Sequence, residues 1–270
     1  MRGAAANRVL ALALGLVLFA ASSAAAQQTQ TAPDASGLLT NFYKNPRPER
    51  LVGFLESFAA TSPGWDAYPP VVGFFGVIFR KDPDWIDKLT SGRLDGKTAE
   101  SISAALRLAG QAGKAPALQA RLAEAGSDAK LKAELAQLPS RLEDLRVATP
   151  THLDILWGAS FASGDGRYAR TIIEFFARTA NRSELVALDV AKISLAMLGG
   201  PKEILTQVRG KYGDAPAREM VFAATALWAL TTNAQRHAFV DKAVADYVQE
   251  QAGSHAAKAL SALRPNTRRT

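Results

Sequence analysis

The sequence predicts an all-α protein built from stacked antiparallel helical hairpins, an arrangement similar to an α-solenoid. Three observations support this fold class. Apolar residues recur at helical spacing along almost the whole chain, no segment alternates convincingly at the period of a β-strand, and pairs of helices are expected to begin near residues 150, 182 and 215. A repeat of about 32 residues made of two helices is typical of helical-repeat proteins.

The N-terminal segment has the three parts of a secretory signal peptide. The first eight residues carry two arginines, residues 9–20 are an apolar run, and small residues precede Gln27. The run is shorter than the ~20 residues that a membrane-spanning helix needs. We therefore expect residues 1–26 to be cleaved after Ala26. The mature protein would then be periplasmic or secreted, without a transmembrane segment.

Residues 27–139 are expected to form an N-terminal helical region. Apolar residues recur at i, i+3, i+4 and i+7 from Leu51, and a broader apolar face begins at Val71, after two prolines. The segment "DPDWIDKL" indicates a short helix capped by Asp82. Further helices are expected at 102–109, 115–125 and 128–138.

Pro139 ends this region, and residues 140–149 are expected to connect it to a C-terminal region of helical hairpins, residues 150–264. Thr149 can cap the first helix of that region, with Pro150 at its first position. A basic tail, residues 265–270, closes the chain. The later helices are expected at 183–198, 202–211, 215–231, 234–251 and 254–263.

The segment "ASGDGRYA" could be a functional loop or the turn between two helices. A calcium loop needs carboxylates at alternating positions, and the residues after Gly166 are arginine, tyrosine and alanine. Gly164 is instead suited to end one helix, and Asp165 to cap the next. We therefore predict a tight turn between antiparallel helices, with Trp157 packed in the core.

Four segments together resemble a group of uncharacterised exported helical proteins of Gram-negative bacteria: "FYKNPRPERLVGFLESF", "VVGFFGVIFRKDPDWIDKL", "LDILWGASFASGDGRYARTIIEFF" and "ATALWALTTNAQRH". The resemblance covers most of the mature chain and implies a helical fold and export, but no activity. Residues 163–176 also resemble the middle of a tetratricopeptide repeat, with Gly164 at the turn and Ala169 five residues later. The rest of that consensus does not match, so a solenoid-like stack is expected instead.

The composition narrows the function classes. The chain contains no cysteine, so the core alone must support the fold of an exported protein, and 48% hydrophobic residues over 270 positions suffice for that. The formal charge of +7 is spread along the chain, apart from the tail. Because neither a basic stripe nor a known recognition module occurs, we expect no nucleic-acid partner.

Few residues indicate a catalytic or metal site. His152, His237 and His255 are expected on three different helices, without the clustering that a zinc site needs. The sequence contains no nucleophile elbow and no phosphate-binding loop. We therefore expect no metal, no cofactor and no catalytic histidine.

Two pairs of carboxylates could perform acid–base chemistry in a cleft. One pair is Glu143 with Asp144, in the connector, and the other is Asp154 with Glu174, on neighbouring helices. Charged residues on helices are far more often solvated or ion-paired, and no surrounding pattern distinguishes these four.

The proline-rich loop "ATSPGWDAYPP" contains the candidate binding residues, Trp65 and Tyr68. Their rings could form a shelf for a ligand or peptide. Alternatively, they fold back over the Phe-rich helices on either side of the loop.

Together these features favour a non-catalytic protein that binds a protein or peptide, or serves as a scaffold, in the cell envelope. Stacked helical hairpins create extended surfaces that usually engage such partners. The alternative is a hydrolytic or lytic enzyme that acts on an envelope polymer through a carboxylate in a helical cleft. A deep pocket with a buried carboxylate of shifted pKa would favour the enzyme.

Overall fold

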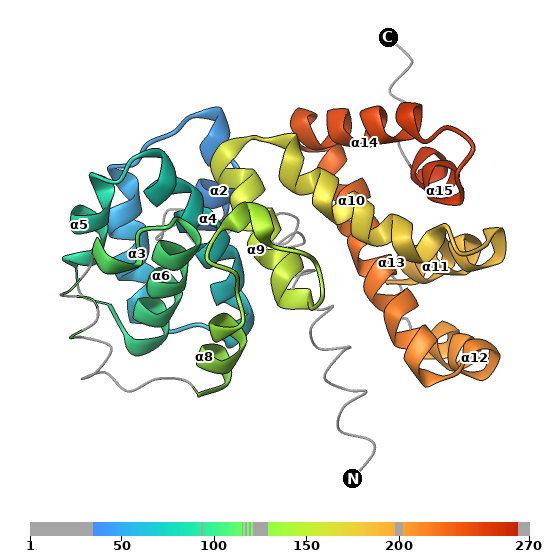
Figure 1. Ribbon diagram of the computed structural model, residues 1–270, viewed down its shortest axis with the longest axis horizontal. Coiled ribbons are helices and arrows are strands. Elements are labelled where there is room, and N and C mark those ends of the chain that lie inside the picture. Colours follow the sequence, from blue (N-terminus) through green and yellow to red (C-terminus); the bar gives the residue numbers. More distant parts are fainter. Residues whose placement is uncertain are drawn as a thin grey trace, which may run out of the picture. The chain divides into compact units, whose positions relative to one another are not determined.

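The structure is a computed structural model that describes residues 35–263, except 93, 115, 117, 119, 121–128 and 198–201 (Figure 1). Its described residues form helices and no β-strand, so the all-α fold is confirmed. One isolated bridge joins Ala109 to Arg141. The expected signal peptide and basic tail lie outside the described residues, as does most of the helix expected at 115–125.

The chain divides into two compact units, residues 1–164 and 165–270, which are described separately. The division falls one helix later than the connector at 140–149 that the sequence suggests. The reason is that α9 (Pro150–Ser163) packs closely against α4 (Tyr68–Lys81) of the first unit. Both helices are buried on nearly every side, so each needs the other as a neighbour.

The first unit is arranged around α4, which is covered by α9 and by α6 (Gly96–Leu108) (Figure 1). Phenylalanine rings fill the space around α4; Phe54 and Phe75 stack, with ring centroids 6.3 Å apart. The remaining elements are α2 (Ala35–Thr40), η1 (Phe42–Lys44), α3 (Arg50–Thr61), η2 (Trp65–Ala67), α5 (Trp85–Thr90), η3 (Ala112–Lys114), α8 (Ala129–Ala136) and η4 (Leu142–Asp144).

The helices α4 and α9 cross with their backbones in direct contact. Gly73 of α4 faces the backbone carbonyl of Ile155, and Gly158 of α9 faces the backbone carbonyl of Pro70. A Cβ atom at either glycine would overlap the facing carbonyl oxygen, so only glycine fits at these two positions. This pairing of residues also shows that the two helices run antiparallel.

The second unit is a stack of helices in which α13 contacts α10, α11, α12 and α14. Consecutive helices also contact one another, which is compatible with the solenoid-like arrangement expected from the sequence. The helices are α10 (Gly166–Ala180), α11 (Glu184–Ala196), α12 (Lys202–Tyr212), α13 (Asp214–Ala234), α14 (Ala238–Glu250) and α15 (His255–Leu263).

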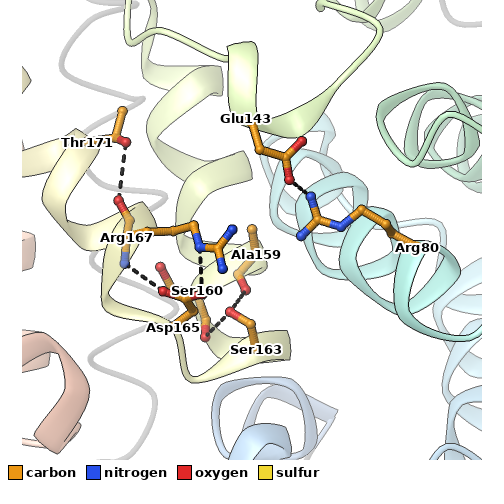
Figure 2. Close-up of polar contacts among 8 residues, drawn as sticks. All are labelled: Arg80, Glu143, Ala159, Ser160, Ser163, Asp165, Arg167 and Thr171. Carbon is orange, nitrogen blue, oxygen red and sulfur yellow. Dashed lines mark hydrogen bonds and ion pairs between the residues drawn. The ribbon is translucent and has the colours of Figure 1, made fainter.

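The end of α9 and the start of α10 have the caps that the sequence predicts. Gly164 adopts the left-handed conformation, with φ of 67°, and its N–H donates to the Ser160 carbonyl at 2.8 Å. Asp165 accepts a hydrogen bond of 2.9 Å from the Arg167 backbone N–H and one of 2.6 Å from its guanidinium (Figure 2). These polar residues therefore stabilise helix ends.

Two other helices begin later than the sequence predicts. Helix α5 begins at Trp85, two residues later than expected, with Asp84 at the N-cap position, while the Asp82 carboxylate accepts a 3.2 Å hydrogen bond from the Asp84 backbone N–H, as a capping side chain does. The sequence places His237 inside a helix that starts near residue 234. In the structure α13 extends to Ala234, and His237 is the N-cap of α14, which begins at Ala238.

Within the described ranges, none of the helices combines the length and the apolar character that crossing a bilayer requires.

Candidate functional site

The two candidate aromatic residues have different environments. Tyr68 is fully buried in the first turn of α4, and its ring meets the edge of Phe58 with centroids 5.0 Å apart. Trp65, in η2, is only partly buried. Tyr68 therefore belongs to the core, as the alternative interpretation of the loop expects, and Trp65 alone keeps part of its surface available to a ligand.

His152 has a structural environment at the start of α9. Its Nδ1 lies 2.8 Å from the Arg146 carbonyl oxygen and 3.2 Å from the Ala148 backbone nitrogen. Burial lowers the pKa of His152, although the hydrogen bond to Arg146 and the charge of Glu134 partly offset this effect. His152 thus holds the connector against α9. No group of three or more potential metal-ligating side chains occurs among the described residues.

Three of the four candidate carboxylates have ordinary surface roles. Glu143 forms an ion pair with Arg80 (Figure 2), and Asp144 is exposed. Glu174 accepts a 3.2 Å hydrogen bond from Arg170 on its own helix. Ion pairs at or near the surface contribute little to stability and do not indicate a catalytic centre.

Asp154 differs from the other carboxylates. Its side chain is partly buried on α9, a helix that is otherwise apolar on nearly every side. Burial raises the pKa of Asp154 well above its usual value, and the negative charge of Asp66 raises it further. No described basic residue offsets these two effects. A carboxyl group with a raised pKa keeps its proton to a higher pH than an ordinary aspartate and can donate it.

Two aromatic residues follow Asp154 at i+3 and i+7, on the same side of α9. The rings of Trp157 and Phe161 stack with centroids 5.8 Å apart and an interplanar angle of 22°. Both are buried, and the indole N–H of Trp157 has no hydrogen-bond partner within the described part of the chain. We call Asp154, Trp157 and Phe161 the α9 row.

The second unit carries a row of exposed apolar side chains on α11. Leu185, Leu188 and Leu195 expose 50%, 50% and 58% of their surface, and the other face of α11 packs against α13. Together with Lys192 they are spaced by three, four and three residues, which places all four on one helical face. We call these four residues the leucine seam.

Next to the leucine seam, Asp189 joins α11 to α12. Its carboxylate accepts hydrogen bonds from Lys211 Nζ at 2.7 Å and from the Tyr212 hydroxyl at 2.9 Å. Burial raises the pKa of Asp189, but these hydrogen bonds and the charges of Lys211 and Lys192 outweigh burial, so the net pKa is lowered. Asp189 is therefore a charged structural residue at neutral pH.

No protein-family model matches the chain, and no curated protein or solved structure matches it. The function is accordingly inferred from the leucine seam and the α9 row.

Proposed function

We propose that the protein is an exported, non-catalytic binding module of the cell envelope, which holds a protein partner on the leucine seam. The observation that carries this proposal is the half-exposed state of three leucines on one face of α11. Exposed apolar side chains that share one face of a helix are a candidate interaction site. Export is supported by the three parts of the N-terminal segment, residues 1–26.

The packing of α11 supports a binding role for the seam. The opposite face of the helix is buried within the second unit and ties α11 to its neighbours. The leucines are therefore not needed to attach α11. Covering the exposed half of each leucine would contribute roughly 1 kcal/mol, so the three leucines supply about 3 kcal/mol, and further contacts around them must offset the cost of association.

Replacing Leu188 and Leu195 together with glutamine should abolish partner binding with little effect on folding. Both side chains already expose half or more of their surface to water in the folded protein, so the free energy of unfolding should change by less than about 0.5 kcal/mol. The measurements are chemical unfolding of the purified protein and complementation of a deletion strain.

The matched control replaces the same two leucines with methionine, which keeps the surface apolar and should preserve function. A photo-crosslinking residue at position 188 of the parent protein should capture a partner. The glutamine variant has no leucine at that position, so it is labelled at position 185 and should not capture the partner. Full complementation by a folded glutamine variant would overturn the proposal.

A second function, an enzyme acting on an envelope polymer, is favoured by Asp154 specifically. A partly buried carboxyl group with a raised pKa, next to a second carboxylate, is an arrangement that general acids use. In this case Asp154 would donate the proton to the leaving group, and Asp66 would be the candidate base or nucleophile. One substitution separates the two functions.

Asp154→Asn should stabilise the protein at pH 8 and leave its stability nearly unchanged at pH 4. Because the folded-state pKa is raised, the contribution of Asp154 to stability is fully present below the unfolded pKa of ~3.9 and is lost as pH rises through the folded pKa. Asparagine cannot ionise, so it avoids this loss. A tenfold difference in proton affinity corresponds to ~1.4 kcal/mol, and we expect a gain of about 1 kcal/mol or more in chemical unfolding.

The control variant is Asp144→Asn, an exposed position of the same unit, for which no gain that grows with pH is expected. The binding proposal also expects Asp154→Asn to complement a deletion strain. A stabilised Asp154→Asn protein that has lost all function would instead identify Asp154 as catalytic, because removing a general acid typically costs a factor of 10²–10⁴ in rate.

A further inference from the structure

We infer that the occupant of the leucine seam is a single amphipathic helix of another protein, with an acidic residue opposite Lys192 in its apolar face. This inference rests on the proposed function and specifies the chemistry of the partner. Three features of α11 carry it: the spacing of the seam, its small area and the position of its one charge.

The spacing of the seam matches the packing of two helices. Intervals of three, four and three residues are those of the a and d positions in a coiled coil, where side chains of one helix insert between those of another. A strand presents side chains at a period of two and cannot contact all four positions in register. An amphipathic helix with apolar residues at i, i+3 or i+4 and i+7 can do so.

The area of the seam suits one helix and not a second copy of this chain. The seam extends over three helical turns of α11, a helix of 13 residues. The exposed halves of three leucines provide much less than the roughly 800 Å² per partner that a stable dimer buries. A single helical segment, by contrast, needs a contact surface no wider than such a row.

The charge of Lys192 determines what the partner must carry. The Lys192 side chain is 55% exposed, and it lies between Leu188 and Leu195 along the seam. Its ammonium forms an ion pair with Asp189 at 3.6 Å, but Asp189 also accepts hydrogen bonds from Lys211 and Tyr212, so this one carboxylate is shared between two ammonium groups.

A helix that covers the seam removes water from this ammonium, which is costly unless an opposite charge compensates. A glutamate or aspartate opposite Lys192 supplies that charge. A lysine in the same place would instead be repelled, so the seam distinguishes partner helices by one residue.

The test uses the full mature chain and two fluorescent synthetic peptides of equal helix content. Each peptide carries leucines at four successive a and d positions and differs from the other only at the place opposite Lys192, where it has glutamate or lysine. Fluorescence anisotropy should show at least about tenfold tighter binding of the glutamate peptide, which corresponds to ~1.4 kcal/mol. The Lys192→Glu variant should reverse this preference, and Leu188→Gln should weaken both peptides.

Equal binding of both peptides, or a preference that Lys192→Glu does not change, would overturn the inference. So would a concentration-dependent dimer that Leu188→Gln abolishes, because the occupant would then be a second copy. The complementation experiment with the glutamine variants stays separate from this one. If the glutamine variants lose function while the protein binds both peptides equally, the acidic-helix inference fails and the binding function stands. If the glutamine variants complement the deletion strain fully, the binding function itself fails.

Discussion

Gly73→Ala is expected to lower the free energy of unfolding of the first unit by about 3 kcal/mol or more, and Gly158→Ala should do the same. At each position a methyl group would overlap a backbone carbonyl oxygen of the facing helix. Overpacked side chains typically cost 1–3 kcal/mol because flexible neighbours can move. Here the obstacle is backbone, so α4 and α9 must separate and lose contacts along their whole crossing.

Gly53→Ala is the matched control for both variants. Gly53 is the fourth residue of α3, in the same unit, and nothing stands within 4 Å of the position that its Cβ would occupy. Alanine should therefore stabilise the protein there by roughly 0.5–1 kcal/mol through helix propensity. Chemical unfolding monitored by circular dichroism checks all three. Gly73→Ala and Gly158→Ala with unchanged stability would show that the two helices are not in backbone contact.

Combining Gly73→Ala with Gly158→Ala should cost less than the sum of the two single changes. Once the first methyl group has forced the helices apart, the second meets a gap that is already open. A double variant that costs less than the sum would show that both glycines act at the same contact between α4 and α9. Two independent losses of local packing would instead add up.

The helices themselves could be predicted because their signals are local. The apolar period from Leu51 and Val71 and the caps at Gly164 and Asp165 depend on residues within a few positions of each other. For the same reason the helices expected after residue 183 agree with α11 to α15 within a few positions at most of their ends.

The tertiary features could not be predicted in this way. The boundary after α9 follows from the Gly73 and Gly158 contacts, whose only signal in the sequence is a glycine within an otherwise apolar helix. The raised pKa of Asp154 depends on burial and on Asp66, which lies far away along the chain. The exposure of Leu188 depends on which face of an apolar helix its neighbours cover, and periodicity does not determine that.

Trp157→Ala is expected to lower the free energy of unfolding by about 3–5 kcal/mol, the usual range for removing a large buried aromatic side chain. The indole is only 3% exposed and stacks on Phe161. Because α9 is packed on nearly every side, alanine would leave a cavity between α9 and its neighbours. Chemical unfolding of the purified variant at pH 7 measures this loss.

Trp157→Phe separates the contribution of packing from that of the indole N–H. The ring remains available to stack on Phe161, and the buried N–H that lacks a described hydrogen-bond partner is removed, so the cost should stay below about 1.5 kcal/mol. A large cost for phenylalanine would mean that the N–H is satisfied by a bound water or ligand. An alanine variant that unfolds like the parent but loses function would place Trp157 at a ligand contact, and the α9 row would then be part of a binding site instead of the core.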